Sequence, residues 1–217
     1  VDTLADLPVH VRECLFWELD PVARARAERE GRAAEEKRAW VSHVLLEWGS
    51  CGRVLYVDGQ PAGFVLYAPP AYFAGSASLP TSPLPEDVVQ LATLCVLPGH
   101  TGGGLGRVLL QAMAKDLLKR GAPRAVEAIA ATRRHPGGCV LPAEFLSRVG
   151  FRTHRPHPLY PRMRLELRSV LTWREDVEAA LERLVGVVVP RPAPAAPEPP
   201  LREPLRGGAR STSALAP

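Results

Sequence analysis

One segment between residues 88 and 120 constrains the fold more than any other part of the chain. An apolar, β-rich run from Val88 to Leu97 predicts a central strand, and Pro98-Gly99 ends it. Three glycines, Gly102–Gly104, then precede an amphipathic helix predicted from Leu105 to Arg120. Successive glycines let backbone N–H groups approach an anion without interference from a Cβ atom, and the helix dipole adds positive charge there. The sequence therefore predicts an anion-binding loop within an α/β fold.

The spacing of the loop excludes two familiar phosphate sites. Gly106 is followed by Arg107-Val108, whereas a Walker loop needs lysine and then serine or threonine. The dinucleotide fingerprint Gly-x-Gly-x-x-Gly, started at Gly102, would need glycine at position 107. A protein that binds nucleotide phosphates through some other loop remains an alternative.

The run Thr101-Gly102-Gly103-Gly104-Leu105-Gly106, after Val96-Leu97-Pro98, resembles the acetyl-coenzyme A loop of the GCN5-related N-acetyltransferases. That family carries Arg/Gln-x-x-Gly-x-Gly/Ala after a strand ending in Val-x-Pro. A Val149-Gly150-Phe151 run after a short helix also resembles the family, and the resemblance covers roughly residues 35 to 168. Thr101 departs from the pattern, because arginine or glutamine usually stands at that position.

The order of predicted elements agrees with this resemblance. We expect an α/β (α+β) fold: a mixed, mostly antiparallel sheet flanked by helices over residues 1–168, without the usual first strand. A C-terminal helix over 169–186 and a disordered Pro/Ala-rich tail over 187–217 would follow. The other predicted elements are helices over 22–48 ended by Gly49, a hairpin over 53–57 and 63–67 turning at Asp58-Gly59, a long loop over 69–85, a strand over 125–131, a short helix over 142–149, and strands over 151–154 and 162–167.

The resemblance implies an enzyme that transfers an acetyl group from acetyl-coenzyme A to a primary amine by direct nucleophilic attack. The acceptor would be a small molecule or a peptide. Backbone amides near Cys95, Val96 and Leu97 would polarise the thioester carbonyl, with those of Cys95 and Val96 as the catalytic pair. The residues implied at the pyrophosphate are Thr101, Gly102, Gly103, Gly104, Leu105, Gly106 and Arg107.

The proton donor and the base are not evident from the sequence. The family's usual tyrosine acid corresponds to Leu146, which has no proton to donate. Because of Leu146 and Thr101, a non-catalytic acyl-coenzyme A-binding module of the same fold is an alternative.

Several other side chains are candidates for roles in the site. Glu127 is either a base or a residue on a solvated strand face. Cys95 is either a buried core residue or a residue that lines the active site. The others are Cys139 as a thiol donor, Tyr160 at the acceptor end, Glu18 as an amine contact or core residue, and Tyr72 and Phe73 as parts of an acceptor lid.

Composition excludes several other classes. The net charge is +4, and the tail contributes half of it through four arginines against two glutamates, so nucleic-acid binding is not indicated. The four cysteines form no closely spaced pair, so we expect reduced thiols, no metal site and a cytoplasmic protein. No apolar stretch is long enough for a membrane span. A missing first strand would expose a sheet edge that could support a homodimer.

Overall fold

The computed structural model describes residues 2–121, 125–133 and 138–167. Within these residues the strands form one sheet in the order β1-β2-β3-β4-β7-β6, and β5 pairs with β4 off this path. Only the β3–β4 and β4–β5 pairs are parallel, which confirms a mixed, mostly antiparallel sheet. The predicted helix over 169–186 and the tail over 187–217 lie outside the described residues.

Four helices precede the sheet: α1 (Asp2–Ala5), α2 (Val9–Glu13), α3 (Pro21–Arg29) and α4 (Ala33–Trp48). The Asp20 carboxylate caps α3 by accepting hydrogen bonds from the backbone N–H groups of Val22 and Ala23, at 2.8 and 3.0 Å. Gly49 ends α4 with a φ of +80°, which is the left-handed conformation favoured at this position.

The hairpin of β1 (Gly52–Val57) and β2 (Gln60–Ala68) turns at Asp58 and Gly59. Both turn residues have positive φ, at 49° and 76°, as a two-residue type I′ turn requires. β1 lies at one edge of the sheet, and no strand precedes it in the described part of the chain.

The remaining elements follow the predicted order, with one addition. They are β3 (Val89–Val96), α5 (Leu105–Lys119), β4 (Ala125–Ala131), β5 (Leu141–Pro142), α6 (Ala143–Arg148), β6 (Arg152–Arg155) and β7 (Arg162–Glu166). The two-residue β5 was not predicted, because nothing local distinguishes so short a strand from a loop.

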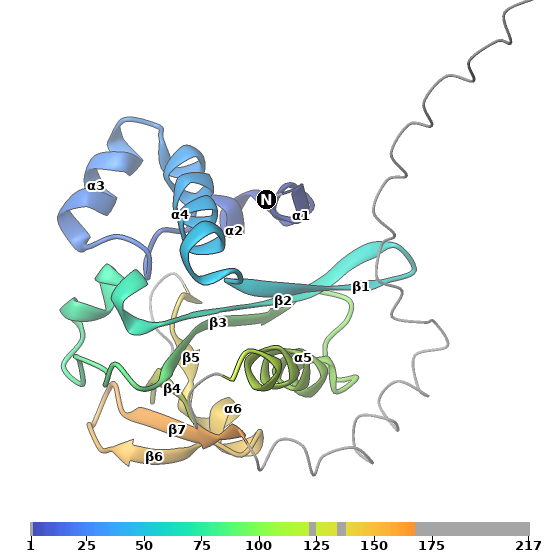
Figure 1. The fold of residues 1–217 in the computed structure, drawn as a ribbon, viewed down its shortest axis with the longest axis vertical. Coiled ribbons are helices and arrows are strands. Elements are labelled where there is room, and N and C mark those ends of the chain that lie inside the picture. Colours follow the sequence, from blue (N-terminus) through green and yellow to red (C-terminus); the bar gives the residue numbers. More distant parts are fainter. Residues whose placement is uncertain (1, 122–124, 134–137, 168–217) are drawn as a thin grey trace, which may run out of the picture.

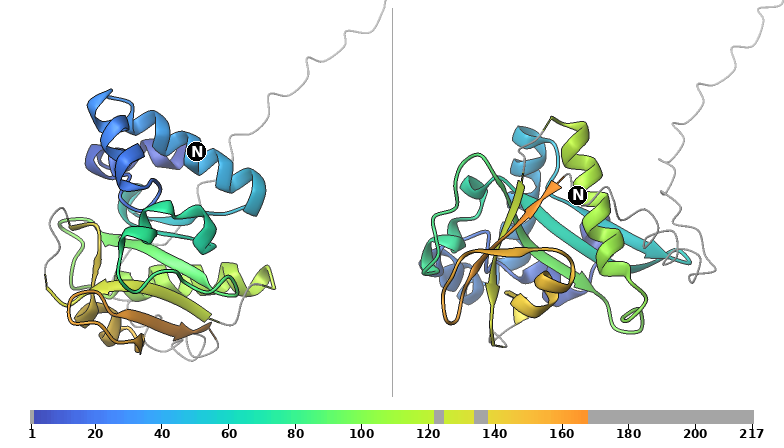
Figure 2. Two further views of the ribbon diagram at one scale, coloured as in Figure 1. Left: turned by 90° about the vertical axis from the view of Figure 1, so that its left-hand side faces the viewer. Right: turned by 90° about the horizontal axis from the view of Figure 1, so that it is seen from below.

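Helices cover both faces of the sheet. Figures 1 and 2 show α1–α4 on one face and α5 on the other. The core splits accordingly, because alternate residues of a strand point to opposite faces. Val126, Ala128 and Ala130 of β4 join the cluster under α5, whereas Ile129 and Ala131 join the cluster under α4.

The segment over 69–85 was predicted as a long loop, and several of its apolar side chains are buried in the core. It contains the short 3-10 helices η1 (Pro70–Tyr72) and η2 (Ala74–Ser78). Phe73, Leu79 and Leu84 are buried in the cluster under α4. The structure therefore contradicts the prediction that Phe73 belongs to an acceptor lid, while Tyr72 bonds through its hydroxyl to Glu47 at 2.9 Å.

Candidate functional site

The central strands β3 and β4 separate along most of their length. They pair only at Val89–Val126 and Gln90–Glu127, and beyond Gln90 neither strand bonds the other. The far end of β4 pairs instead with β5, through Ala130 and Ala131. The opening between β3 and β4 is called the splay below, and it leaves one side of β3 without a ladder partner.

The pairing of β3 with β2 decides which of its amides face the splay. The Leu97 N–H donates to the Ala62 carbonyl of β2 at 2.8 Å. Cys95 opposes Phe64 in the same register, so alternation turns its N–H toward β2 as well. The N–H groups of Leu94 and Val96 therefore face the splay.

This geometry changes which of the expected amides can reach a ligand in the splay. The amide of Val96 faces the splay, whereas the amides of Cys95 and Leu97 are directed toward β2. The amide of Leu94 also faces the splay, and sequence reasoning missed it. Whether the N–H group of a strand residue points toward one neighbouring strand or the other depends on the hydrogen-bond register. Only the register in the structure could therefore identify the amide of Leu94.

The glycine loop leaves its backbone donors unsatisfied. Among the described residues, no N–H group from Thr101 to Gly106 donates to a backbone carbonyl, and the first bonds of the helix start at Arg107. Gly102 and Gly104 have φ of +86° and +82°, so the turn needs glycine at both positions. A Cβ added at Gly102 or Gly103 would meet no atom within 4 Å. The backbone is therefore open to a ligand at a helix N-terminus, where an anion is favoured.

The start of α5 is fixed by close packing. Leu105 is buried, and a Cβ on Gly106 would lie 3.2 Å from the Phe145 ring of α6. The Arg107 guanidinium approaches the Arg148 carbonyl at 3.5 Å. α5 and α6 thus hold the loop at the same end of the splay as the end of β3.

A cavity of about 400 Å³, called the splay pocket below, lies between the N-terminal helices and the splay. Thr93, Leu94 and Cys95 of β3 line it, as do Gly138 and Cys139 before β5. Its apolar walls include Leu7, Val11, Val41, Phe64, Leu66 and Leu141. Cys95 is half-buried and lines this cavity, in agreement with the second of its two predicted roles.

A buried ion pair supplies charge at the wall of the splay pocket. Glu18 and Lys37 both line the pocket, are almost fully buried, and bond directly to each other. Lys37 Nζ also donates to the Cys14 carbonyl at 2.8 Å. Glu18 Oε2 is buried and has no hydrogen-bond partner among the residues that the structure describes. An unsatisfied buried carboxylate oxygen is unfavourable and favours a ligand that brings a hydrogen-bond donor.

Two cysteines from distant parts of the sequence meet at the same pocket. Cys14 Sγ and Cys139 Sγ are 3.4 Å apart, although 125 positions separate them. The hydrogen bond between the two thiols lowers the pKa of Cys14 to about 6, against burial that raises it. The same bond, together with burial, raises the pKa of Cys139 well above its ordinary value. The contact therefore favours one thiolate shared by the pair over two separate thiols.

A profile described as the acetyltransferase (GNAT) family matches residues 13–136, which is more than half of the chain. The chain belongs to the GNAT family of acetyltransferases. No curated protein matches this sequence.

Among solved structures, the PaiA N-acetyltransferase from Thermoplasma acidophilum in complex with coenzyme A has a TM-score of 0.49 and 15% identity, over 76% of this chain and 93% of that one. A GNAT-family protein from Desulfovibrio desulfuricans has a TM-score of 0.46 and 21% identity, over the same shares. The ribosomal-protein-S18-alanine N-acetyltransferase from Escherichia coli has a TM-score of 0.38 and 17% identity, over 60% and 76%.

Glu127 is not among the residues that line the splay pocket. This carboxylate is fully buried on β4, and guanidinium nitrogens of Arg162 and Arg164 on β7 lie 3.1 and 3.2 Å from its oxygens. Arg162 also bonds to the Pro83 carbonyl at 2.6 Å, so the segment over 69–85 covers the cluster. The structure contradicts the prediction that Glu127 lies on a solvated strand face, whereas its role as a base stays a prediction.

The other predicted donors have different positions. Cys139 lies at the pocket, as described. The Tyr160 ring packs against the cluster under α4 and stacks on His157, and it is not among the residues that line the splay pocket. Leu146 is fully buried under α5, so the residue at the usual tyrosine position belongs to the core of this protein.

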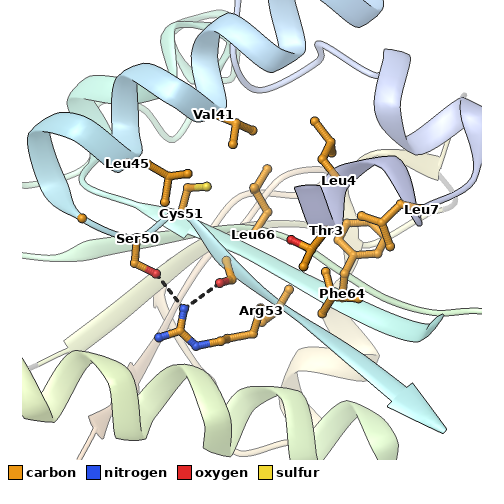
Figure 3. Close-up of a pocket in the computed structure, with 14 residues that line it drawn as sticks. Thr3, Leu4, Leu7, Val41, Leu45, Ser50, Cys51, Arg53, Phe64 and Leu66 are labelled. Atoms are coloured by element: carbon orange, nitrogen blue, oxygen red, sulfur yellow. Dashed lines mark hydrogen bonds between the residues drawn. The ribbon is translucent and has the colours of Figure 1, made fainter. Parts of the chain in front are cut away.

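A second cavity of about 250 Å³ lies over β1 and β2 at the edge of the sheet (Figure 3). Thr3, Leu4 and Leu7 lie on one side of it, and Val41 and Leu45 of α4 lie on another. It shares Leu4, Leu7, Val41, Phe64 and Leu66 with the splay pocket, so the two cavities adjoin.

Neither metal binding nor a membrane span is indicated in the described residues. They contain no group of three or more histidine, cysteine or acidic side chains placed to hold a metal ion. None of the helices in the same ranges combines the length and apolar character that crossing a membrane takes.

Proposed function

We propose that this GNAT protein transfers an acetyl group from acetyl-coenzyme A to a primary amine by direct attack. One observation carries the proposal: the open glycine loop follows β3 and packs against Leu94 through Gly106, and Leu94 with its neighbours Thr93 and Cys95 lines the splay pocket. A donor held at the loop can reach the splay with its thioester. An acceptor in the pocket can approach that thioester from the other face of the sheet.

The donor side relies on backbone groups. The unsatisfied N–H groups over 101–106 would hold the pyrophosphate at the start of α5. The N–H groups of Leu94 and Val96 face the splay and would donate to the thioester oxygen as negative charge develops there. Because these donors belong to a strand and a helix, they are held in place before the substrate binds.

The acceptor side pairs one carboxylate with apolar walls. Among the described residues that line the splay pocket, Glu18 Oε2 is a buried acceptor without a donor, and an incoming amine would supply one. The same carboxylate can take the proton that the amine loses, either directly or through water. The pocket walls are mostly aliphatic and aromatic, which favours an amine attached to an apolar body.

The alternative, a non-catalytic acyl-coenzyme A-binding module, is favoured by Leu146. Its side chain is buried in the core and leaves the departing thiolate without the usual acid. Thiol release decides between the two functions. The protein is mixed with acetyl-coenzyme A and a panel of primary amines of graded apolar size, and free coenzyme A is followed with a thiol reagent. Release that depends on the amine supports the transferase, whereas binding without release across the panel supports the module.

A loop variant tests the donor site. Gly102→Asp places a carboxylate among the loop amides, and we expect the affinity for acetyl-coenzyme A to fall at least tenfold, about 1.4 kcal/mol. Gly31→Asp is the matched control, since Gly31 also has positive φ and open space around its Cβ position, at a turn between α3 and α4. Equal affinities of the two variants in calorimetry would refute the donor site. A parallel titration with ATP tests the remaining alternative, because a general nucleotide-phosphate site would bind both ligands.

A further inference from the structure

The Cys14–Cys139 pair has no part in the proposed acetyl transfer, yet its geometry is that of a redox site. The two sulfur atoms are 3.4 Å apart, and a disulfide bond needs about 2.05 Å, so a shift of about 1.4 Å would join them. The surrounding contacts already hold the two segments together. Trp17 Nε1 donates to the Cys139 carbonyl at 2.9 Å, and Lys37 Nζ donates to the Cys14 carbonyl.

We propose that Cys14 and Cys139 form a reversible disulfide when a hydroperoxide oxidises them, and that this bond narrows the splay pocket. Both residues line the pocket, Cys14 from the segment after α2 and Cys139 from the segment before β5. Drawing their sulfur atoms together moves these two walls toward each other. The second half of the proposal, regulation of acceptor binding, rests on the proposed function, whereas the disulfide itself does not.

The chemistry balances with hydrogen peroxide as the oxidant. The Cys14 thiolate attacks one peroxide oxygen, the O–O bond breaks, and hydroxide leaves and takes up a proton to become water. Cys14 is then a sulfenic acid. The Cys139 thiol gives up its proton, its sulfur attacks Cys14 Sγ, and a second water leaves as the S–S bond forms. The two thiols lose two electrons and two protons, and one peroxide becomes two waters.

The environments of the cysteines favour this pair over any other. The hydrogen bond between the two thiols lowers the pKa of Cys14, and Cys14 is only half-buried. Cys51 is buried, and burial raises its pKa to about 11, so it stays protonated. Burial also raises the pKa of Cys95. The attacking and resolving roles therefore fall to Cys14 and Cys139.

Peptide mapping tests the disulfide. The reduced protein is treated with a small excess of hydrogen peroxide, remaining thiols are alkylated, and the digest is analysed by mass spectrometry. We expect a peptide linked through Cys14 and Cys139, lighter by two hydrogens than the separate peptides, that dithiothreitol separates again. The bridge closes a long loop, so the melting temperature should rise by roughly 10 °C.

Variants and a kinetic measurement complete the test. Cys139→Ala should abolish the link, while Cys51→Ala should keep it; should Cys139→Ala fail to fold, the map of the unaltered protein still decides. Unlinked Cys14 and Cys139, a link to Cys51 or Cys95, or a link between two chains would each overturn the disulfide.

In the oxidised protein we expect the KM for the amine to rise roughly threefold or more, with unchanged affinity for acetyl-coenzyme A. An unchanged KM would overturn the proposal that the disulfide narrows the splay pocket, but not the disulfide itself. If no amine is acetylated at all, the proposed function fails, and the peptide map still tests the disulfide.

Discussion

At the scale of single residues, the site depends on polar groups whose partners come from distant positions. Glu18 and Lys37 are buried together at a pocket that is otherwise mostly apolar. Taking two charges out of water is costly, and a buried pair of this kind is weak evidence for stability. Their position at the pocket instead suits a role in recognising a charged or hydrogen-bonding acceptor.

The thiol of Cys14 offers a prediction at the residue scale. Because the pKa of Cys14 is lowered to about 6, its rate of alkylation by iodoacetamide should rise between pH 5 and 7 and level off above. Cys51 should become reactive only in strongly alkaline solution, since its pKa is raised to about 11. The rates are measured residue by residue from digests of the alkylated protein.

A variant tests whether the hydrogen bond with Cys139, and not the pocket environment in general, lowers the pKa of Cys14. Cys139→Ala removes the thiol that is hydrogen-bonded to Cys14, so the midpoint for Cys14 should move up toward the ordinary cysteine value. A midpoint near 9 in the unaltered protein would show that the hydrogen bond does not hold the thiolate.

At the scale of elements, the close approach of β2 and β3 fixes the amides that face the splay. Gly63 lies opposite Val96, and a Cβ at Gly63 would come within 2.7 Å of the Cys95 carbonyl and 3.3 Å of the Val96 Cα atom. Only glycine allows this spacing, because the atoms that a side chain would meet belong to the backbone and have little room to move.

Gly63→Ala should therefore lower both stability and donor binding. We expect a loss of about 1–3 kcal/mol in the free energy of unfolding, measured from urea midpoints, because the strands must shift to admit the methyl group. Gly103→Ala is the control for stability, since its Cβ would meet nothing within 4 Å and its backbone does not require glycine. Equal urea midpoints for the two variants would contradict this prediction, because β2 and β3 would then move apart without a loss in the free energy of unfolding.

At the scale of the whole molecule, the proposed site combines parts from several layers of the fold. The loop precedes α5, the amides belong to the sheet, and the splay pocket is lined by the N-terminal helices together with β2 and β3. Figure 1 shows α1–α4 and α5 on opposite sides of the sheet. A ligand that contacts both the loop and the sheet should stabilise the folded protein as a unit.

Thermal unfolding measures this coupling. At a hundred times its dissociation constant, acetyl-coenzyme A should stabilise the protein by about 2.7 kcal/mol. For a chain of this length that corresponds to a rise of roughly 5–10 °C in melting temperature. Gly102→Asp should lose most of this rise, whereas Gly31→Asp should keep it. A rise of the same size with ATP would contradict selective binding of the coenzyme.

Most of the elements could be predicted because their signals are local. Asp20-Pro21, Gly49 and Asp58-Gly59 have the conformations that their residue types favour, and β4 has the predicted bounds. Trp40, Val41 and Val44 recur at helical spacing, which is a local signal for the helix α4. Lys37 was missed as a pocket residue because it belongs to a charged run, although it lies one turn before Val41 on the same stripe.

The candidate side chains could be predicted less well than the loop. Glu127 interrupts an apolar strand, which correctly marked it as unusual, but its partners on β7 lie 35 and 37 positions later. The segment over 69–85 has the composition of a loop, yet its few apolar residues pack into the core. Neither the contacts of Glu127 with β7 nor the packing of the 69–85 segment can be predicted from amino-acid composition.

The sequence alone determined the order of elements and the phosphate-type loop, because glycine conformations, caps and hydrophobic periods act within a few residues. Only the tertiary structure decided that Leu94 and Val96 face the splay, that Glu127 is enclosed, and that Cys14 meets Cys139. Those outcomes depend on strand register and on the packing of segments far apart in the chain, and no local preference encodes them.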